Sequence, residues 1–178
     1  MTMLLVAVGC VAWIVAHAQP SLYDHMAVVG PLRGDWWKLF ASAFVYTDGL
    51  VAFVVLLAVG LFGWLLERRY GPVLVAALFL GASAVGALVA LAVYPLALVM
   101  GANAGALALL AAWAVPDLEA ARAGEHYEGD LLGTGAIAAL LLAIPFARPE
   151  VSWLAGLTGG VLGLLIGLGV HRLRGAEA

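Results

Sequence analysis

The 178-residue sequence has very few charged side chains, since Asp, Glu, Lys and Arg make up only 11% of it while 65% is hydrophobic. Soluble domains carry about 25% charged and 45–50% apolar residues, so this shortage excludes an ordinary soluble fold. Only eight residues are Lys or Arg and the net charge is −3, which excludes the basic surface that nucleic-acid binding requires. The apolar residues suffice for about six spans of ~20 residues. We therefore expect one domain over residues 1–178, embedded in the lipid bilayer.

Cysteine is almost absent as well. A single residue, Cys10, excludes an intrachain disulfide and a cysteine metal cluster, and we expect neither a metal nor a cofactor. Cys10 stands in an apolar run, where it is expected to be a small buried side chain. The alternative is that residues 7–10 (Ala-Val-Gly-Cys) form a lipoprotein cleavage site, but no Lys or Arg precedes them, as a secretory signal would require.

Stretches without charge predict six membrane helices. They cover residues 1–16, 49–67, 73–93, 102–115, 131–146 and 152–171. Pro95 separates the third from the fourth, because proline lacks the N–H that a helix needs. A long hydrophilic connection, residues 17–49, joins the first two helices, and the acidic run 117–130 is expected to be a solvated loop. The predicted fold class is an all-α membrane protein with a six-helix bundle.

The few cations predict the orientation of this bundle. With six spans both termini lie on the same side of the membrane. That side would hold Arg68, Arg69, Arg122, Arg172 and Arg174, whereas the other would hold Arg33, Lys38 and Arg148. Because positive charge is enriched on the cytoplasmic side, we expect both termini in the cytoplasm, the plasma membrane as the location, and the long connection outside.

Four short motifs follow one another along the chain. Trp36-Trp37-Lys38 stands in the long connection, and Glu67-Arg68-Arg69-Tyr70-Gly71 ends the second expected helix. Gly101-Ala102-Asn103-Ala104 opens the fourth, and residues 153–160 (Trp-Leu-Ala-Gly-Leu-Thr-Gly-Gly) begin the sixth. In the order and spacing of these motifs the chain, over about residues 30–172, resembles the rhomboid family of intramembrane serine proteases. The residues that match the family motifs are Trp37, Lys38, Glu67, Arg69, Gly71, Gly101, Gly156 and Gly160.

The catalytic residues implied by this resemblance are replaced. The family's serine nucleophile corresponds to Asn103 and its histidine base to Trp153. An amide is a poor nucleophile, and an indole N–H has no basic lone pair. The family's side-chain oxyanion donors correspond to positions near Val51 and Val55, which are apolar. The resemblance therefore implies a rhomboid-like pseudoprotease, with no catalytic residue, that binds transmembrane segments of other proteins between its second and fifth spans.

Two other functions stay open. Gly81-Ala82-Ser83-Ala84 imitates the protease motif halfway along the third expected helix. One alternative is thus an active serine endopeptidase with relocated catalytic residues, although no histidine falls in the middle of a span. The other is a structural or assembly protein without a cleft. If it has no catalytic role, Ser83 is expected to be a small packing residue whose hydroxyl bonds to the helix backbone.

Glycine spacing predicts how the last helix packs. The glycines concerned are Gly156 and Gly160, which form one pair, and Gly159, Gly163 and Gly167, which form a ridge. Glycines at this spacing let helix backbones approach closely in lipid. We expect the sixth helix to pack on the fourth, with Gly101 and Gly105 facing it.

Two polar side chains lie at expected helix ends. Asn103 is expected to bond to a backbone carbonyl, the Trp153 indole or a water, or else to line a binding pocket, because an unpaired polar group in a membrane span is costly. Glu67 is expected to be a structural hydrogen-bonding group rather than a proton relay. The spans contain no other Asp, Glu, Lys or Arg, which argues against an ion-coupled transporter.

Overall fold

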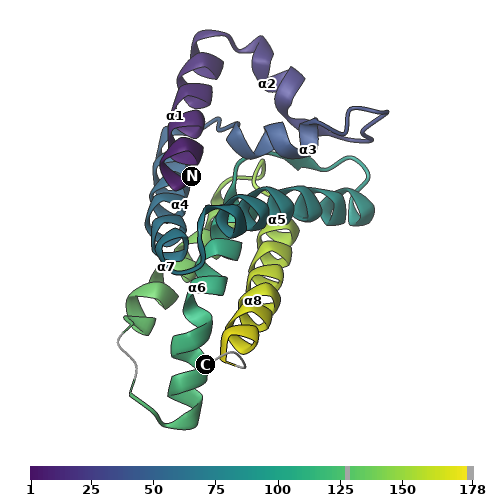
Figure 1. Cartoon of the computed structure of the whole chain (residues 1–178). Helices are drawn as coiled ribbons and strands as arrows, with labels where there is room; N and C mark the ends of the chain where they lie inside the picture. Colours follow the sequence, from purple (N-terminus) through teal and green to yellow (C-terminus); the bar gives the residue numbers. More distant parts are fainter. Residues whose placement is uncertain (127–128, 176–178) are drawn as a thin grey trace.

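The computed structural model describes residues 1–126 and 129–175, and these are mostly helical (Figure 1). The long helices are α1 (Thr2–Ala18), α4 (Gly49–Tyr70), α5 (Pro72–Val93), α6 (Asn103–Ala123), α7 (Leu131–Ala147) and α8 (Trp153–Gly175). The segment between α1 and α4 contains α2 (Ser21–Met26), β1 (Val28–Val29), α3 (Lys38–Ala41) and the 3-10 helix η1 (Ser42–Phe44), and β2 (Leu98–Val99) lies between α5 and α6. The long helices agree closely with the predicted ones except at the end of α6.

Four helices of the described chain are long and apolar enough to cross a membrane, namely α4, α5, α6 and the part of α8 from Trp153 to Leu173. The apolar helices α1 and α7 have 17 residues each. At 1.5 Å per residue each is about 25 Å long, against a hydrocarbon core of about 30 Å. The structure is thus an all-α protein with four helices of full spanning length and two shorter apolar helices.

Helix α1 packs antiparallel along α4. Near the start of α1, a Cβ on Gly63 would lie 2.9 Å from Cγ2 of Thr2, and at its other end a Cβ on Gly49 would lie 3.1 Å from the Trp13 ring. The Glu67 carboxylate accepts a hydrogen bond from the Thr2 N–H at 2.7 Å, which satisfies one of the free donors in the first turn of α1. The prediction that Glu67 is a structural hydrogen-bonding group at a helix end is confirmed.

The turn between α4 and α5 depends on two adjacent residues. Gly71 has φ +89°, a conformation that favours glycine, and its N–H donates to the Glu67 carbonyl at 2.9 Å. Pro72 follows at the first position of α5, where its missing N–H would have had no helical partner. The chain therefore reverses direction directly after α4.

Helix α6 is the central helix and packs with its backbone against α8, as Figure 1 shows for the two neighbouring ribbons. A Cβ on Gly159 would lie 2.1 Å from the Ala104 carbonyl oxygen, and one on Gly163 would lie 2.2 Å from the Ala108 carbonyl oxygen. Gly167 continues the same ridge. Any side chain at these positions would collide with backbone, so the predicted packing of the sixth long helix on the fourth is confirmed.

Three other glycines do not contribute to the interface between α6 and α8, so the packing predicted for them was wrong. Gly105 faces α5, where a Cβ would lie 2.7 Å from Cδ2 of Phe79. Gly101 has φ +82°, and a Cβ on it would lie 3.5 Å from the Tyr46 ring. No atom lies within 4 Å of a Cβ on Gly160, so this glycine lies outside the contact surface between α8 and α6.

The segment between α1 and α4 folds over the end of the bundle at which α4, α6 and α8 begin. Val28 pairs with Val99 and Val29 with Leu98 in a two-stranded antiparallel sheet. This pairing ties the segment to the chain between α5 and α6. Figure 1 shows α2 and α3 together at this end, which we call the connection end.

Helix α6 continues through Pro116 to Ala123 rather than ending near residue 115 as predicted. The Ala112 carbonyl cannot receive a helical N–H from Pro116, but Ala112 packs against Gly167 of α8, where a Cβ would lie 2.8 Å from its Cα. Packing thus holds the helix where a hydrogen bond is missing. The predicted solvated loop is helical up to residue 123, and residues 127 and 128 of that prediction lie outside the described residues.

Cys10 is exposed on α1, and the prediction of a buried side chain was wrong. Its neighbour Gly9 is the residue that faces α4, with a Cβ position 2.6 Å from Leu56. The apolar run around Cys10 therefore indicates contact with lipid rather than with protein.

Candidate functional site

Asn103 is held at the first position of α6 by the backbone around it. The Gly101 N–H donates to the Ser42 carbonyl at 2.9 Å, and the Met100 N–H donates to the Glu150 carbonyl at 3.2 Å. The left-handed conformation of Gly101 turns the chain into the helix. Segments from three parts of the sequence thus fix Asn103, which is 2% exposed.

The Asn103 amide is buried without a hydrogen bond. Within the described residues, neither its Oδ1 nor its Nδ2 has a partner. Its Nδ2 lies 3.0 Å from where a Cβ on Gly156 of α8 would be. The expected hydrogen bond to a carbonyl or to Trp153 is therefore not present. A buried amide without a partner costs about 1–3 kcal/mol.

Trp153 does not lie on the face of α8 that packs against α6. That face carries Gly156, Gly159 and Gly163, whereas Trp153 is 48% exposed and shares the outer face with Leu157, which is 46% exposed. Gly156, rather than Trp153, therefore faces Asn103. The two residues assigned to the family's dyad are brought to the same end of neighbouring helices, but no hydrogen bond joins them in the described chain.

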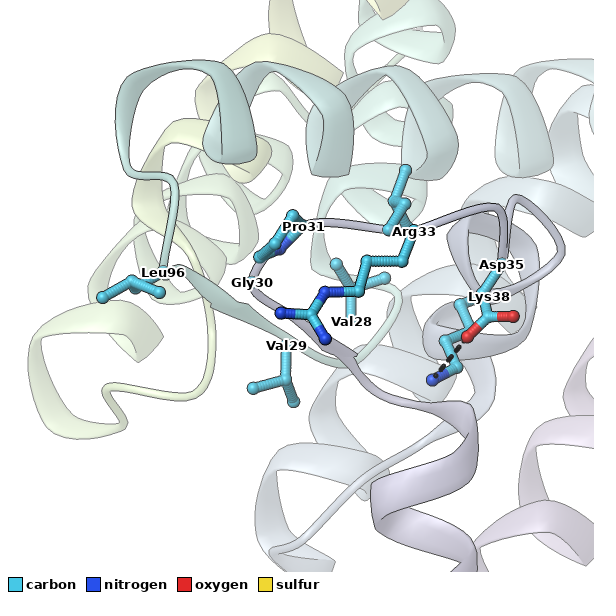
Figure 2. Close-up of a pocket in the computed structure, with 9 residues that line it drawn as sticks. Val28, Val29, Gly30, Pro31, Arg33, Asp35, Lys38 and Leu96 are labelled. Carbon is cyan, nitrogen blue, oxygen red and sulfur yellow. Dashed lines mark ion pairs between the residues drawn. The ribbon is translucent and has the colours of Figure 1, made fainter.

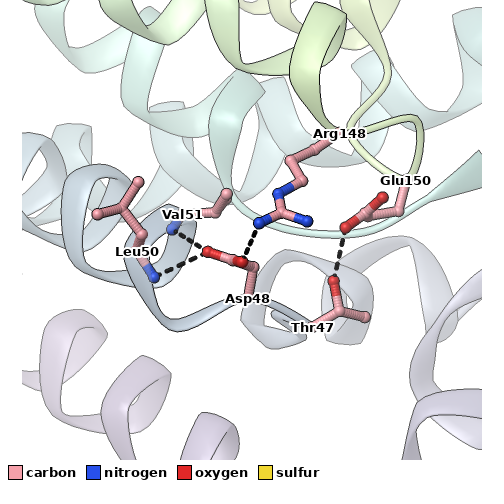
Figure 3. A network of polar contacts seen from close by, with 6 residues as sticks. All are labelled: Thr47, Asp48, Leu50, Val51, Arg148 and Glu150. Carbon is pink, nitrogen blue, oxygen red and sulfur yellow. Dashed lines mark hydrogen bonds and ion pairs between the residues drawn. The ribbon is translucent and has the colours of Figure 1, made fainter.

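A polar network joins the start of α4 to the loop between α7 and α8 (Figure 3). Asp48 accepts hydrogen bonds from the N–H groups of Leu50 and Val51 at 2.9 and 3.0 Å, which caps α4, and it forms an ion pair with Arg148. The Val51 N–H, followed by the charge of Arg148, holds the pKa of Asp48 below its usual value. The network therefore fixes the end of α7 against the start of α4.

A second contact in this network is Thr47 Oγ1, which donates to Glu150 Oε1 at 2.8 Å. Sequence reasoning missed both pairings. Asp48 before Gly49 is a typical helix-capping position and could have been found. The partners Arg148 and Glu150 are about a hundred residues away, and no local pattern indicates them.

The space beside the start of α6 is closed. A cavity of only about 10 Å³ lies next to Tyr46, Val51 and Gly101, which is room for about one water molecule. Tyr46 is 2% exposed, and burial raises the pKa of its hydroxyl. This cavity is far too small to admit a peptide beside the start of α6.

The contacts that the structure gives for the four histidines do not include Asn103. The hydroxyl of Tyr23 is 2.9 Å from His17 Nδ1, and His25 Nδ1 is 2.7 Å from the Ser21 carbonyl oxygen. His171 lies 3.4 Å from Glu119, and His126 lines a cavity at the opposite end of the bundle. In residues 1–126 and 129–175 no hydrogen bond joins a histidine to a serine side chain.

Ser83 of α5 is buried at 6% exposure against α6. Its Oγ lies 2.8 Å from where a Cβ on Gly105 would be and has no hydrogen-bond partner in the described chain. The expected bond to the helix backbone is thus absent. Ser83 has neither a base nor an open path to solvent.

Lys38, the last residue of the Trp-Trp-Lys motif, lines a separate cavity of about 370 Å³ at the connection end. Figure 2 shows the Arg33 guanidinium beside this cavity and Lys38 paired with Asp35, with a distance of 3.2 Å between Nζ and Oδ2. Trp36 and Trp37 are 62% and 51% exposed. Trp37 therefore belongs to the surface, and the half-buried Lys38 is paired with Asp35.

The motif of residues 67–71 lies at the opposite end of the bundle. Glu67 caps α1 and Gly71 forms the turn into α5, as described above. The Arg69 guanidinium lies 5.6 Å from the centre of the Tyr70 ring and 5.7 Å from that of Trp113 on α6. This motif therefore joins α1, α4, α5 and α6 and does not form a reaction site.

The apolar helices, the glycine-packed pair α6 and α8 and the folded connection define a helical membrane protein. The family model described as Rhomboid domain matches residues 33–173, which is more than half of the chain. The chain belongs to the rhomboid family. No curated protein matches it.

Proposed function

We propose that the chain is a catalytically inactive rhomboid-like protein that binds transmembrane segments of other proteins. The observation that carries the proposal is Asn103, which occupies the position assigned to the nucleophile and is buried with both amide atoms unpaired. An amide cannot replace a serine hydroxyl as a nucleophile. The described histidines lie elsewhere, so no base is available beside it.

The positions assigned to the oxyanion donors support the same proposal. Val51 is 7% exposed and Val55 is fully buried, and both belong to the apolar core. Neither side chain can donate a hydrogen bond to a developing negative charge. Nucleophile, base and side-chain donors are therefore all replaced at the positions that the family resemblance gives.

The proposal includes six membrane spans, with α1 and α7 as the short ones, both termini in the cytoplasm and the plasma membrane as the location. The excess of arginine at the end of the bundle that holds Arg68 and Arg69 supports this orientation. A cysteine introduced at Leu96, which is 85% exposed at the connection end, is expected to react with a membrane-impermeant maleimide in intact cells. Reaction only after lysis would contradict the orientation.

Client binding is tested by photocrosslinking in membranes. Val54 of α4 and Ile137 of α7 are half-buried residues that pack against the main core, on the two helices between which the family resemblance implies lateral access. A photoreactive residue at either position is expected to capture a transmembrane segment. Val161 on the outer face of α8, 55% exposed, is the matched control. Capture equal to this control at both positions would contradict the proposal.

Inactivity is tested separately with a fluorophosphonate probe that labels activated serines. We expect no labelling of the wild-type protein. Labelling that disappears in Ser83→Ala would instead establish an active protease with relocated residues. Labelling that persists in Ser83→Ala would point to another serine and would equally contradict inactivity.

A structural or assembly role is the second candidate, and the closed space at the start of α6 favours it. The cavity there holds about one water molecule, so a static scaffold would need no further opening. The crosslinking experiment separates the two functions, because a scaffold would capture no client from Val54 or Ile137.

A further inference from the structure

A long apolar groove of about 740 Å³ runs along the outer side of the α1–α4 pair. Small residues of α4, namely Gly49, Ala52 and Gly60, leave room for it, and Trp13 and Trp64 line its two ends. Gly49 and Trp64 are fifteen residues apart, so the groove is about 22 Å long. It is separate from the start of α6 and from the α4–α7 side where clients are proposed to bind.

The groove has the shape and chemistry of a site for a hydrocarbon chain. Its lining carries no charged side chain and Cys10 is its only titratable residue. Phe53 and Leu57 are 64% and 59% exposed beside it. One leaflet of a bilayer has about 15 Å of hydrocarbon, so the groove is long enough to hold an acyl chain of a lipid along its whole length.

A cation stands at one end of this groove. The Arg68 guanidinium lies over the Trp64 ring at 4.9 Å, and it makes no ion pair within the described chain. The neighbouring Glu67 carboxylate is directed to the start of α1 instead. Asp117 borders a cavity that Arg68 also lines but is not paired with it. Arg68 is thus placed to meet an anion at the membrane surface.

We propose that this groove binds one anionic phospholipid, with an acyl chain along α1 and α4 and its phosphate on Arg68. The groove combines a long apolar surface with a cation at one end. A phospholipid matches both, because one molecule carries an apolar acyl chain and a negatively charged phosphate. A partner helix would match the apolar part but would need an added carboxylate at the level of Arg68. The inference requires membrane insertion and is independent of client binding.

The first test uses the wild-type protein in vesicles of phosphatidylcholine that contain a small fraction of lipid brominated near the headgroup. The quenching of Trp64 is obtained as the difference between the wild type and Trp64→Phe. Brominated phosphatidylglycerol is expected to quench Trp64 more strongly than brominated phosphatidylcholine, by about the fivefold preference that ~1 kcal/mol for one Arg near the surface gives. Equal quenching by both lipids would overturn the proposal.

The second test uses native mass spectrometry with added phosphatidylglycerol or phosphatidylcholine. Gly60→Leu fills the groove and is expected to remove the retained lipid. Gly81→Leu is its control, since a Cβ on Gly81 meets nothing within 4 Å. Arg68→Gln is expected to abolish the preference for phosphatidylglycerol, whereas Arg122→Gln should retain it. If Gly60→Leu retained as much lipid as the wild type, the proposal would be overturned. It would also be overturned if the wild type were a dimer and Gly60→Leu a monomer, because a second copy of the chain would then occupy the groove.

Discussion

Asn103 and Gly156 face each other where α6 and α8 begin, and a Cβ on Gly156 would lie 3.0 Å from Nδ2 of Asn103. Because glycine offers no side chain, the amide meets a helix surface without a donor or acceptor in reach. The position that the family resemblance gives to a reacting hydroxyl therefore holds an amide that makes no hydrogen bond within the described residues.

Replacing this amide by an apolar group of similar shape should stabilise the protein. Asn103→Leu removes the unpaired donor and acceptor, and the free energy of unfolding in bicelles is expected to rise by about 1–3 kcal/mol. Asn103→Asp, which buries a charge, should lower it and serves as the control. A loss of stability in Asn103→Leu would show that the amide has a partner in the membrane.

Two adjacent glycines of α8 should respond to alanine in opposite ways. Gly159→Ala places a Cβ 2.1 Å from the Ala104 carbonyl oxygen, and such a backbone collision is expected to cost about 3 kcal/mol or more. Gly160→Ala meets nothing within 4 Å and should gain up to about 1 kcal/mol from helix propensity. Thermal unfolding of both variants measures the difference in stability. Equal melting temperatures would contradict the packing of Gly159 against the backbone of α6.

Asp48 should link stability to pH through its two contacts. Asn is as good a helix cap as Asp, so Asp48→Asn loses only the ion pair with Arg148, whereas Asp48→Ala loses the cap as well. Melting temperatures at neutral pH should fall in the order wild type, Asp48→Asn, Asp48→Ala. If both variants melted at the wild-type temperature, the network would have no effect on stability.

The sign of the pH effect follows from the lowered pKa of Asp48. The stability that the carboxylate contributes is present above the unfolded pKa of about 3.9 and is lost as the pH falls through the lower folded value. The melting temperatures of the wild type and Asp48→Asn should therefore converge as the solution is acidified below about pH 4. A difference that stays constant down to pH 2 would contradict the carboxylate as its cause.

Removing the Glu67 carboxylate should loosen the first turn of α1. Glu67 accepts from the Thr2 N–H at 2.7 Å and from the Met1 amine at 2.6 Å, and Glu67→Ala leaves these donors without that partner. Hydrogen exchange over residues 2–6 is expected to accelerate, while α8 keeps its protection. Glu119→Ala, which removes the partner of His171, is the control and should not affect α1.

The sequence predicted the helices well because lipid requires long stretches without charge. The ends of those stretches mark the ends of α4, α5 and α8. The prediction failed at the end of α6, because the charged residues that follow Pro116 indicate the end of a membrane helix. Packing of Ala112 on Gly167 carries the helix through this proline, and such a contact between distant residues leaves no local pattern.

The candidate site was predicted in part. The motif order placed Asn103 at a helix start, and the structure buries it there. The register of α8 could not be read from residues 153–160, which contain three glycines of which two, Gly156 and Gly159, face α6. Spacing alone does not distinguish the buried face from the outer one, and for this reason the Trp153 indole remained one of several possible partners of Asn103.

The glycine ridge also has a mechanical consequence. Backbone contacts at Gly159 and Gly163 leave no space through which α8 could rotate or slide against α6. Helix α7 is different, because only Leu141 and Ile144 are buried along its length. We therefore expect α7 to move more freely than α8 in any sideways opening of the bundle, and spin labels on α7 should show a broader range of distances to α6 than labels on α8.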